Sequence, residues 1–560
     1  MPIFALPRGS SPTKGARRRA WPDWRRTLHL DRVSIGLTTI ILGGALARFL
    51  GGSWGLPLGL NPDEHVIVSG AMDMARRHSF EPAVYFRPDH VEIQISNLAY
   101  LAYAGLFHGS SPLSLYAANP APFILISRTI TACFGVAMIV LAYLIGKRFT
   151  RPVGVMAAFL VAFFPMYVDQ SHLASPDVPL TLTLMIVILG CMRYLDSPSW
   201  GNLLLACFGV SASIAIKYPG ALGSIMIAIT VITGAVRARA WSRILVHGSG
   251  ALAAVIGFLF AISPVLFTNI HVVISAMTGE SGGNTSSVAD DRGRAGNLGF
   301  YAQTFASTSG IILLVCFVLG VLWCVRLRMV QSLPLWLGAI YWVLLSTVPI
   351  AWARWGLPMF LTPLLVAPIG AYYSFRYLRE RDRARWWRWG ATGLGVIASV
   401  NLVAGSVAVT AGYLAPDTRT VATTYFDAHR VTRANTIFEG YTPLFPGGQR
   451  TIFDQFTVVD GRLTPAHEYR GNTRNTYVAL SSDMYGRYAN DPKYATEQKF
   501  YALVRGQFPL LKTFQPATRG NPTTLEGTSI WDALNYSRQV VLGGLSGPTI
   551  EVYEIPTERT

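Results

Sequence analysis

The chain has 560 residues, of which 51% are hydrophobic and only 14% are charged, and its formal net charge is +17. A soluble domain carries about 25% charged residues, so this composition excludes a soluble protein and indicates several membrane-spanning segments. The five cysteines all lie in apolar segments, which excludes a disulfide framework or a cysteine zinc site and favours packing roles.

Residues 1–32 are basic and polar, and the first apolar stretch follows them directly. The triplet Ala45-Leu46-Ala47 resembles a signal cleavage site. However, the charged leader is long for a signal peptide and many apolar segments follow. We therefore expect an uncleaved first span behind a cytoplasmic N-terminus.

The region 33–413 is predicted to be a transmembrane domain of about eleven helices, because each apolar stretch approaches the ~20 residues that a span needs. A long first outer loop, 53–121, follows the first span and contains a helix at 95–109 that we expect to lie along the membrane surface. The Gly/Ser-rich outer loop 269–299 is either a lid or a plain flexible connection. The expected spans are 33–52, 122–146, 152–171, 178–195, 201–217, 219–236, 244–268, 300–325, 334–353, 355–375 and 389–412.

The positive charges set the expected orientation. Arg and Lys gather in the segments that share a side with the N-terminus, above all in 376–388, and such segments face the cytoplasm. Nearly all of the net charge then lies on the inner side. The membrane topology thus explains the net positive charge of the chain, and a nucleic-acid partner is excluded.

Residues 414–560 change in character and are predicted to form an extracytoplasmic α/β domain. They are polar and turn-rich, with strand-like runs at 476–482 and 548–555 and a helix-like run at 494–506. A segment of this length can bury its own core. It shows no nucleophile or metal motif, so we expect it either to cover the site and help to select the acceptor or only to stabilise the outer face.

Several ionisable residues recur at the outer ends of the expected spans. One such charge could simply reach water, but a whole set at one level indicates a shared polar cavity. A lysine and an arginine together suit a phosphate group, and a nearby carboxylate suits a general base for a hydroxyl. The set fits displacement at a carbon that bears a phosphate leaving group. Its members are Asp63, Glu64, Asp169, His172, Asp177, Lys217 and Arg354.

Four motifs in this order resemble the GT-C superfamily of glycosyltransferases, which use polyprenyl-phosphate sugars. They are the acidic pair Asp63-Glu64, "SPDVPL" at 175–180, "KYPG" at 217–220 and "RWGLPMFLTP" at 354–363. The protein O-mannosyltransferase and aminoarabinose transferase relatives (families 39 and 83) are the most similar in pattern. The resemblance implies a GT-C membrane fold with juxtamembrane helices in the first outer loop, in a bacterial cytoplasmic membrane with the C-terminal domain in the periplasm.

The resemblance also implies roles for individual residues. A single sugar would pass from the lipid phosphate to an outer-face acceptor, with inversion. Asp63 matches the base, Glu64 would support it or bind sugar, and Asp177 would orient the acceptor or share a metal. The phosphate would be held by Lys217, Arg354 and Arg87, and the expected substrate contacts are His65, Tyr85, Tyr218 and His172.

Several points stay open at this level. No cofactor is certain, although the three carboxylates could hold a divalent cation through oxygen. The expected partners are the polyprenyl-phosphate sugar, membrane lipids and a glycan, lipid or protein acceptor, whose choice the polar segment 87–97 should shape. The alternatives are a secondary transporter, which tends to place its charges near the midplane, and an oligosaccharide ligase that uses a polyprenyl-diphosphate glycan.

Overall fold

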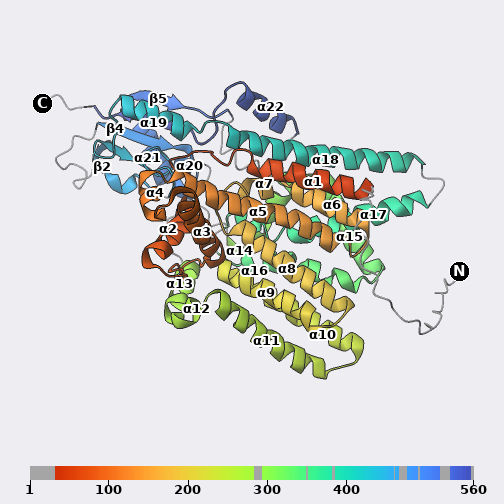
Figure 1. Cartoon of the computed structure of the whole chain (residues 1–560). Coiled ribbons are helices and arrows are strands. Elements are labelled where there is room, and N and C mark those ends of the chain that lie inside the picture. Colours follow the sequence, from red (N-terminus) through yellow and green to blue (C-terminus); the bar gives the residue numbers. More distant parts are fainter. Residues whose placement is uncertain are drawn as a thin grey trace, which may run out of the picture.

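The computed structural model shows a multi-pass α-helical membrane protein with a C-terminal α/β region (Figure 1). The expected cytoplasmic segment falls outside the described residues, apart from Arg32. The described residues are 32–282, 293–348, 351–380, 385–448, 450–459, 461–465, 476–489, 492–517 and 530–556.

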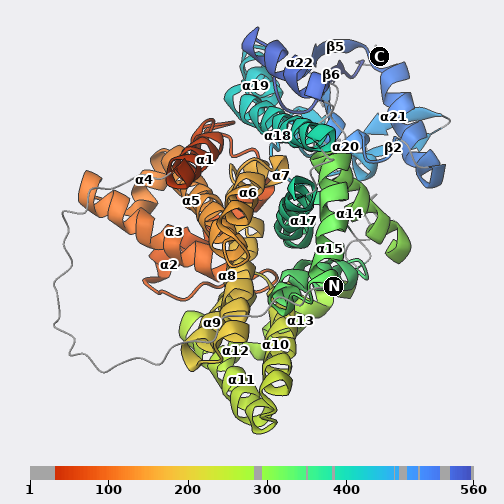
Figure 2. The ribbon, with the colours of Figure 1, turned by 90° about the vertical axis from the view of Figure 1, so that its right-hand side faces the viewer.

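The helical region runs from Arg32 to Leu414 and packs around α8 (Asp177–Asp196), which is buried along nearly its whole length. Helices α5, α9 and α10 surround α8, and α17 packs against α15 and α6 (Figure 2). The other helices are α1 (Arg32–Phe49), α5 (Ala121–Gly146), α6 (Arg151–Ala162), α7 (Pro165–Gln170), α9 (Trp200–Ile216), α10 (Gly223–Ala238), α11 (Ser242–Ile262), α12 (Val265–Thr268), α15 (Ile311–Arg326), α16 (Leu337–Leu345), α17 (Leu361–Arg379) and α18 (Arg385–Leu414).

Among the described residues, five helical segments are long and apolar enough to cross a membrane, and a bent pair adds a sixth if it counts as one span. Four shorter apolar helices also occur. The expected number of about eleven spans is not confirmed by these lengths and stays a prediction. The five are Ala121–Gly146, Asp177–Asp196, Tyr218–Ala238, Ser242–Ile262 and Arg388–Leu414.

Two expected spans are broken at residues that interrupt helices. The span 152–171 is divided into α6 and α7 ahead of Pro165, whose ring removes a backbone donor. The span 300–325 is divided at Gly310, which has a φ of 77° and separates two helices that meet at 113°. Only glycine adopts that conformation without strain, so the bend is encoded locally.

The loop expected at 269–299 is helical wherever the structure describes it. Helices α13 (Ile270–Gly282) and α14 (Gly293–Ser309) enter it from both sides, and residues 283–292 lie outside the described part. Helices that were not expected therefore occupy both ends of this connection, and its role as an outer loop stays a prediction. The run "IHVVISAM" at its start has the apolar content of a helix, which the many Gly and Ser residues further on obscure.

The segment expected to be the first outer loop is helical over much of its length. Its helices are α2 (Pro62–Arg77), α3 (His90–Ala102) and α4 (Pro112–Ala118), and a π-helical turn, Tyr103–Phe107, continues α3 across the expected 95–109 helix. Helices α2 and α3 pack on each other, and α3 also packs on α5 and α9. The segment therefore lies against the bundle and brings its polar residues to one end of the bundle helices.

The C-terminal region is a four-stranded sheet with helices. Its strand order is β1-β4-β6-β5, and only the β1–β4 pair is parallel within that sheet. The expected strands at 476–482 and 548–555 and the helix at 494–506 are confirmed as β4, β6 and α21. The elements are α19 (Thr418–Ala428), β1 (Thr436–Phe438), β2 (Phe456–Val459), β3 (Arg462–Pro465), β4 (Tyr477–Ser481), α20 (Ser482–Tyr485), α21 (Ala495–Gln507), β5 (Leu510–Phe514), α22 (Ile530–Val541) and β6 (Ile550–Glu554).

This region has a hydrophobic core of its own. Val478 and Leu480 of β4 pack with Val504 of α21 and Tyr553 of β6, and all four are buried. The region is joined to the bundle through α18, and its helix α20 lies at the same end of the bundle as α4 (Figure 1). Its loops can therefore reach the polar residues at the membrane surface.

Candidate functional site

Asp63 is fixed by the start of α2. The side chain of Asn61 caps the helix by accepting a hydrogen bond from the Asp63 backbone N–H at 2.9 Å, and Pro62 occupies the first turn. A carboxylate in the first helical turn is favoured by the helix dipole. Asp63 Oδ1 accepts a hydrogen bond from Arg87 Nη1 at 2.9 Å, and its Oδ2 forms an ion pair with Arg354 Nη1.

Asp177 is the first residue of α8 and directly follows Pro176. Its Oδ1 atom lies 3.0 Å from Nζ of Lys217, and its Oδ2 lies 3.8 Å from Nε of Arg354. Lys217 follows the last residue of α9 in an extended conformation, and its ammonium lies 5.1 Å from the centre of the Trp355 ring. Arg354 therefore joins Asp63 to Asp177.

We call these five side chains the charged cluster: Asp63, Arg87, Asp177, Lys217 and Arg354. They come from α2, the loop before α3, α8, the end of α9 and the turn before α17. The structure brings together the three predicted phosphate-binding cations and two of the three predicted catalytic carboxylates. Their catalytic and binding roles stay predictions.

The electrostatics around Asp63 favour its charged form. Burial raises the pKa of this carboxyl, but Arg354, Arg87 and Lys217 outweigh burial and hold the pKa well below its usual range. On the other side of Arg87, Asp89 accepts from Arg87 Nε at 2.8 Å. Burial raises the pKa of Asp89 to about 7, although Arg87 acts in the opposite direction. Asp89 thus titrates near neutral pH beside the cluster.

Two cavities meet at the charged cluster. The bundle cavity, of about 290 Å³, is lined by Arg87, Asp177 and Lys217 together with many apolar side chains. The interdomain cavity, of about 470 Å³, is lined by Asp63 and Arg354 and by residues of the C-terminal region. Since Asp63 pairs with Arg87, and Arg354 with Asp177, the ion pairs of the cluster connect the walls of the two cavities.

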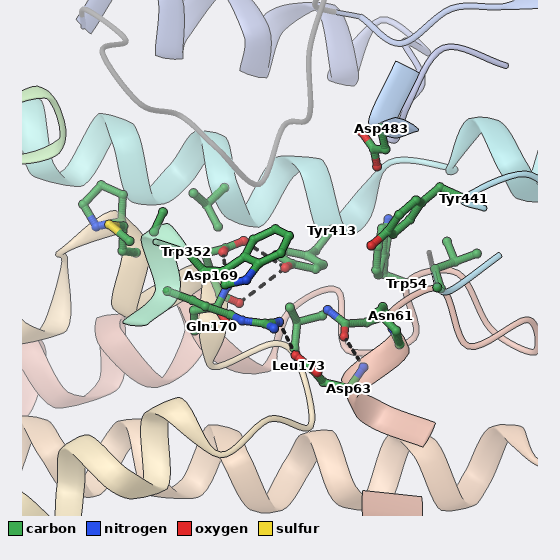
Figure 3. A pocket seen from close by; sticks show the side chains of 18 of the residues that line it. Trp54, Asn61, Asp63, Asp169, Gln170, Leu173, Trp352, Tyr413, Tyr441 and Asp483 are labelled. Atoms are coloured by element: carbon green, nitrogen blue, oxygen red, sulfur yellow. Dashed lines mark hydrogen bonds and ion pairs between the residues drawn. The ribbon is translucent and has the colours of Figure 1, made fainter. Parts of the chain in front are cut away.

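The interdomain cavity combines aromatic rings with polar groups (Figure 3). Asp483 and Tyr441 enter it from the C-terminal region, opposite Asp63 and Asn61. Arg487 lies 5.5 Å from the ring centre of Trp352 and 5.3 Å from that of Tyr441, so it links the C-terminal region to the segment that carries Arg354. Sequence reasoning gave no site residue beyond 414, because isolated polar residues on loops carry no motif.

Glu64 lies apart from the charged cluster. Both of its carboxylate oxygens accept from Arg128 of α5, at 2.6 and 2.8 Å, and both side chains are buried. Arg128 also donates to the carbonyls of Gly52 and Trp54, at 2.8 and 2.6 Å. Glu64 therefore anchors the start of α2 to α5. Sequence analysis missed Arg128, although an arginine inside an expected span was a signal that could have found it.

The predicted substrate contacts are placed differently from one another. Tyr218 lines the bundle cavity and donates from its hydroxyl to the Tyr85 carbonyl at 2.5 Å. The Tyr85 side chain is partly exposed and does not line either cavity. His65 is exposed, with its Nε2 3.1 Å from the Gly59 carbonyl.

His172 is buried beneath the interdomain cavity. Its two ring nitrogens lie 2.9 Å from the carbonyls of Val168 and Leu50, and its ring stacks on Tyr413 at 4.1 Å. Tyr413 in turn donates to Asp169 Oδ1 at 2.9 Å, and both of these residues line the cavity. His172 therefore supports the floor of the cavity from below.

Within the described ranges, no group of three or more His, Cys, Asp or Glu side chains is arranged to hold a metal ion. The three predicted carboxylates do not form such a group, because Glu64 is bound to Arg128 while Asp63 and Asp177 face cations. A divalent cation at this site stays a prediction.

Comparisons with known proteins agree with this architecture. Residues 125–267 match the family model described as dolichyl-phosphate-mannose-protein mannosyltransferase. The archaeal oligosaccharyltransferase AglB from Archaeoglobus fulgidus, solved with an inhibitory peptide and a dolichol-phosphate, is 11% identical with a TM-score of 0.50, over 86% of this chain and 73% of that one. A comparison with curated proteins gives no match.

Two further solved structures are similar to a lower degree. ArnT from Cupriavidus metallidurans, bound to undecaprenyl phosphate, is 13% identical over 71% of this chain and 73% of that one, with a TM-score of 0.44. The Pmt1-Pmt2 protein O-mannosyltransferase complex of S. cerevisiae, bound to its sugar donor, is 19% identical over 48% and 37%, with a TM-score of 0.33.

The chain is thus a membrane protein that shares its fold with AglB, and its residues 125–267 match a mannosyltransferase family model. Both likenesses support the resemblance seen in the motifs, and the activity as a glycosyltransferase stays a prediction.

Proposed function

We propose that this protein transfers a single sugar from a polyprenyl-phosphate donor to an acceptor hydroxyl at the outer face of a bacterial cytoplasmic membrane. The observation that carries the proposal is the charged cluster, in which two carboxylates and three cations meet where two cavities adjoin. Each cavity suits one of the two substrates.

The bundle cavity suits the donor. Arg87 and Lys217 lie on its wall beside apolar residues such as Leu180 and Met277, so it offers cations to a phosphate and an apolar surface to a prenyl chain. Arg354, next to Asp177, completes a set that can bind the phosphate through two guanidinium forks and one point charge. AglB was solved with dolichol-phosphate, a carrier of the same chemical class.

The interdomain cavity suits the acceptor, because Asp63 lies on its wall. The acceptor oxygen attacks the anomeric carbon, the bond from that carbon to the phosphate oxygen breaks, and the phosphate leaves with the electron pair. Asp63 takes the hydroxyl proton, and the cations stabilise the charge that develops on the phosphate. Attack from the side opposite the leaving group inverts the anomeric centre.

Donor binding also prepares the base. In the free protein Arg354 and Arg87 hold the pKa of Asp63 low, which makes this carboxylate a weak base. A phosphate that occupies the same cations lowers the positive potential at Asp63 and raises its basicity. Glu64 acts as a positioning residue, since it holds the start of α2 through Arg128.

The oligosaccharide ligase is a second candidate, favoured by the shared fold with AglB at a TM-score of 0.50. The two functions differ in the lipid: a monophosphate that carries one sugar, or a diphosphate that carries a preassembled glycan. The size of the glycan transferred per turnover separates them.

A transfer assay tests the proposed function. The full chain in nanodiscs receives polyprenyl-phosphate sugars extracted from its own membranes, and loss of the labelled sugar from the lipid is followed. The wild-type protein should consume the donor, whereas an inactive wild-type protein with bound donor would contradict the proposal.

We also propose the topology and the domain limits drawn from the sequence. Residues 1–32 are cytoplasmic, 33–413 form the membrane domain and 414–560 face the periplasm. Reporter tags at the two ends test the orientation, and a cytoplasmic signal from the C-terminal tag would contradict it.

A further inference from the structure

Helix α22 belongs to the C-terminal region but packs on a membrane helix. Its residues Ala533 and Tyr536 form a buried cluster with Ala404 and Ala408 of α18. In Figure 1, α22 lies beside the end of α18 that adjoins the C-terminal region. One face of α22 is therefore covered by a helix that is itself a candidate membrane span, Arg388–Leu414.

The contact sets the depth of α22. Ala408 and Ala404 lie six and ten positions before Leu414, the last residue of α18. At a rise of 1.5 Å per residue, the contact is about 9 to 15 Å inside that end of the span. With the outer boundary near residue 412, where the span expected at 389–412 ends, the contact belongs to the acyl region of the outer leaflet.

The part of α22 that α18 does not cover has an apolar side. Trp531 is 79% exposed, Leu534 48% and Val541 83%, and Leu542 directly after the helix is 73% exposed. Successive helical residues turn by about 100°, which places these side chains on one side. The polar residues Asp532, Asn535 and Gln539 fall on the adjoining part of the helix surface, about 40 to 100° from Trp531.

The neighbouring helix α18, a candidate span, also carries exposed apolar side chains. On α18 itself, Val400, Val407 and Leu414 are 49%, 50% and 59% exposed. Arg538 shares the apolar side of α22, and an arginine can extend its guanidinium to the headgroups while its stem stays among apolar groups. Trp is the side chain most typical of that boundary.

We propose that α22 is embedded in the bilayer beside α18, with Trp531, Leu534 and Val541 in contact with lipid acyl chains. The C-terminal domain is then attached to the membrane at a second place, in addition to its covalent link through α18. This attachment fixes the distance between the domain and the bundle. That distance sets the size of the interdomain cavity, which residues of both parts line.

Photocrosslinking in lipid nanodiscs tests this placement. The photoreactive residue p-benzoylphenylalanine replaces Trp531 or Val541 in the full chain, and adducts are identified by mass spectrometry. Val396 of α18, which is 56% exposed, serves as the lipid-facing control, and the exposed Lys512 of β5 as the water-facing control. The replaced side chains are exposed, so folding should not depend on them.

We expect phospholipid adducts at positions 531, 541 and 396 and at least tenfold fewer at 512. Adducts at 396 without adducts at 531 and 541 would overturn the proposal. Crosslinks from 531 or 541 to a second copy of the chain would also overturn it, because the apolar side would then be an interface between proteins. The readout needs no turnover, so it is independent of the proposed function.

Discussion

The ion pair between Asp63 and Arg354 joins residues that are 291 positions apart in the sequence. One residue begins the first outer helix after the first span, and the other lies in the turn before α17. Their contact places the proposed base beside a proposed phosphate ligand, so that donor binding and proton transfer are coupled through one guanidinium.

The first prediction concerns the base. Asp63→Asn keeps the helix cap and the side-chain shape but removes the proton acceptor. Transfer should fall by at least about 100-fold, the low end for a lost general base, while the donor lipid is still bound. Initial rates of sugar transfer in nanodiscs measure the loss of activity.

Asp73→Asn is the matched control for that variant, because Asp73 lies on the same helix and pairs with Arg76 and Arg77 at the surface. Its activity should equal that of the wild type. Turnover by the Asp63 variant at more than a tenth of the wild-type rate would remove Asp63 as the base.

The second prediction concerns the donor phosphate. Lys217→Ala and Arg354→Ala each remove a charged hydrogen-bond donor, a change typically of about 1.5 to 3 kcal/mol, or roughly 10- to 100-fold. The KM for the donor should rise by that factor. Arg77→Ala, on the exposed face of α2, should leave it unchanged. An unaltered KM in both cluster variants would assign these cations to packing.

The third prediction concerns stability. Arg128→Met leaves the Glu64 carboxylate buried without its cation, which typically costs about 3 to 5 kcal/mol. The melting temperature should drop clearly below that of the wild type. The double variant Glu64→Met/Arg128→Met should recover part of the loss, since no buried charge remains. If the Arg128→Met variant has the same melting temperature as the wild type, the Glu64–Arg128 pair does not anchor α2.

The fourth prediction concerns pH. Asp89 has its pKa raised to about 7, so it is neutral below that pH and releases Arg87 towards Asp63 and the donor. Donor affinity should therefore be higher at pH 6 than at pH 8, by no more than about tenfold per pH unit, the limit for one proton. Asp89→Asn should flatten the donor KM between these pH values. A donor affinity of the wild-type protein that rises with pH would contradict this prediction.

The fifth prediction concerns the acceptor. Arg487 contacts Trp352 and Tyr441 on the wall of the interdomain cavity, so Arg487→Ala should raise the acceptor KM by about tenfold, the effect of roughly 1.4 kcal/mol, and leave the donor KM unchanged. Arg505→Ala, which removes a partly exposed ion pair with Glu551 in the same domain, is the control. A change in donor KM alone would show that this cavity does not receive the acceptor.

The proximity of Asp63, Asp177, Lys217 and Arg354 could be predicted from the sequence, because hydropathy and positive charge predict on which side of the membrane each residue lies. It did not separate Asp63 from Glu64. Neighbouring helical residues point about 100° apart, and only the packing of α2 on α5 decides which of the two faces the cavity.

The C-terminal contributions were beyond the reach of the sequence for a different reason. Tyr441, Asp483 and Arg487 reach the site through tertiary placement of a separate domain, and no local pattern records that placement. In the membrane region, the breaks at Pro165 and Gly310 are visible in the sequence, but a count based on hydropathy alone passes over them.

The most direct test of the central claim is mass spectrometry of the lipids that remain bound to the purified protein, compared between the wild type and the Lys217→Ala/Arg354→Ala variant. The wild type should retain a polyprenyl monophosphate that carries one sugar, and the variant should lose it while other lipids remain. Equal retention of that lipid by both proteins would contradict the claim that the charged cluster binds the donor phosphate.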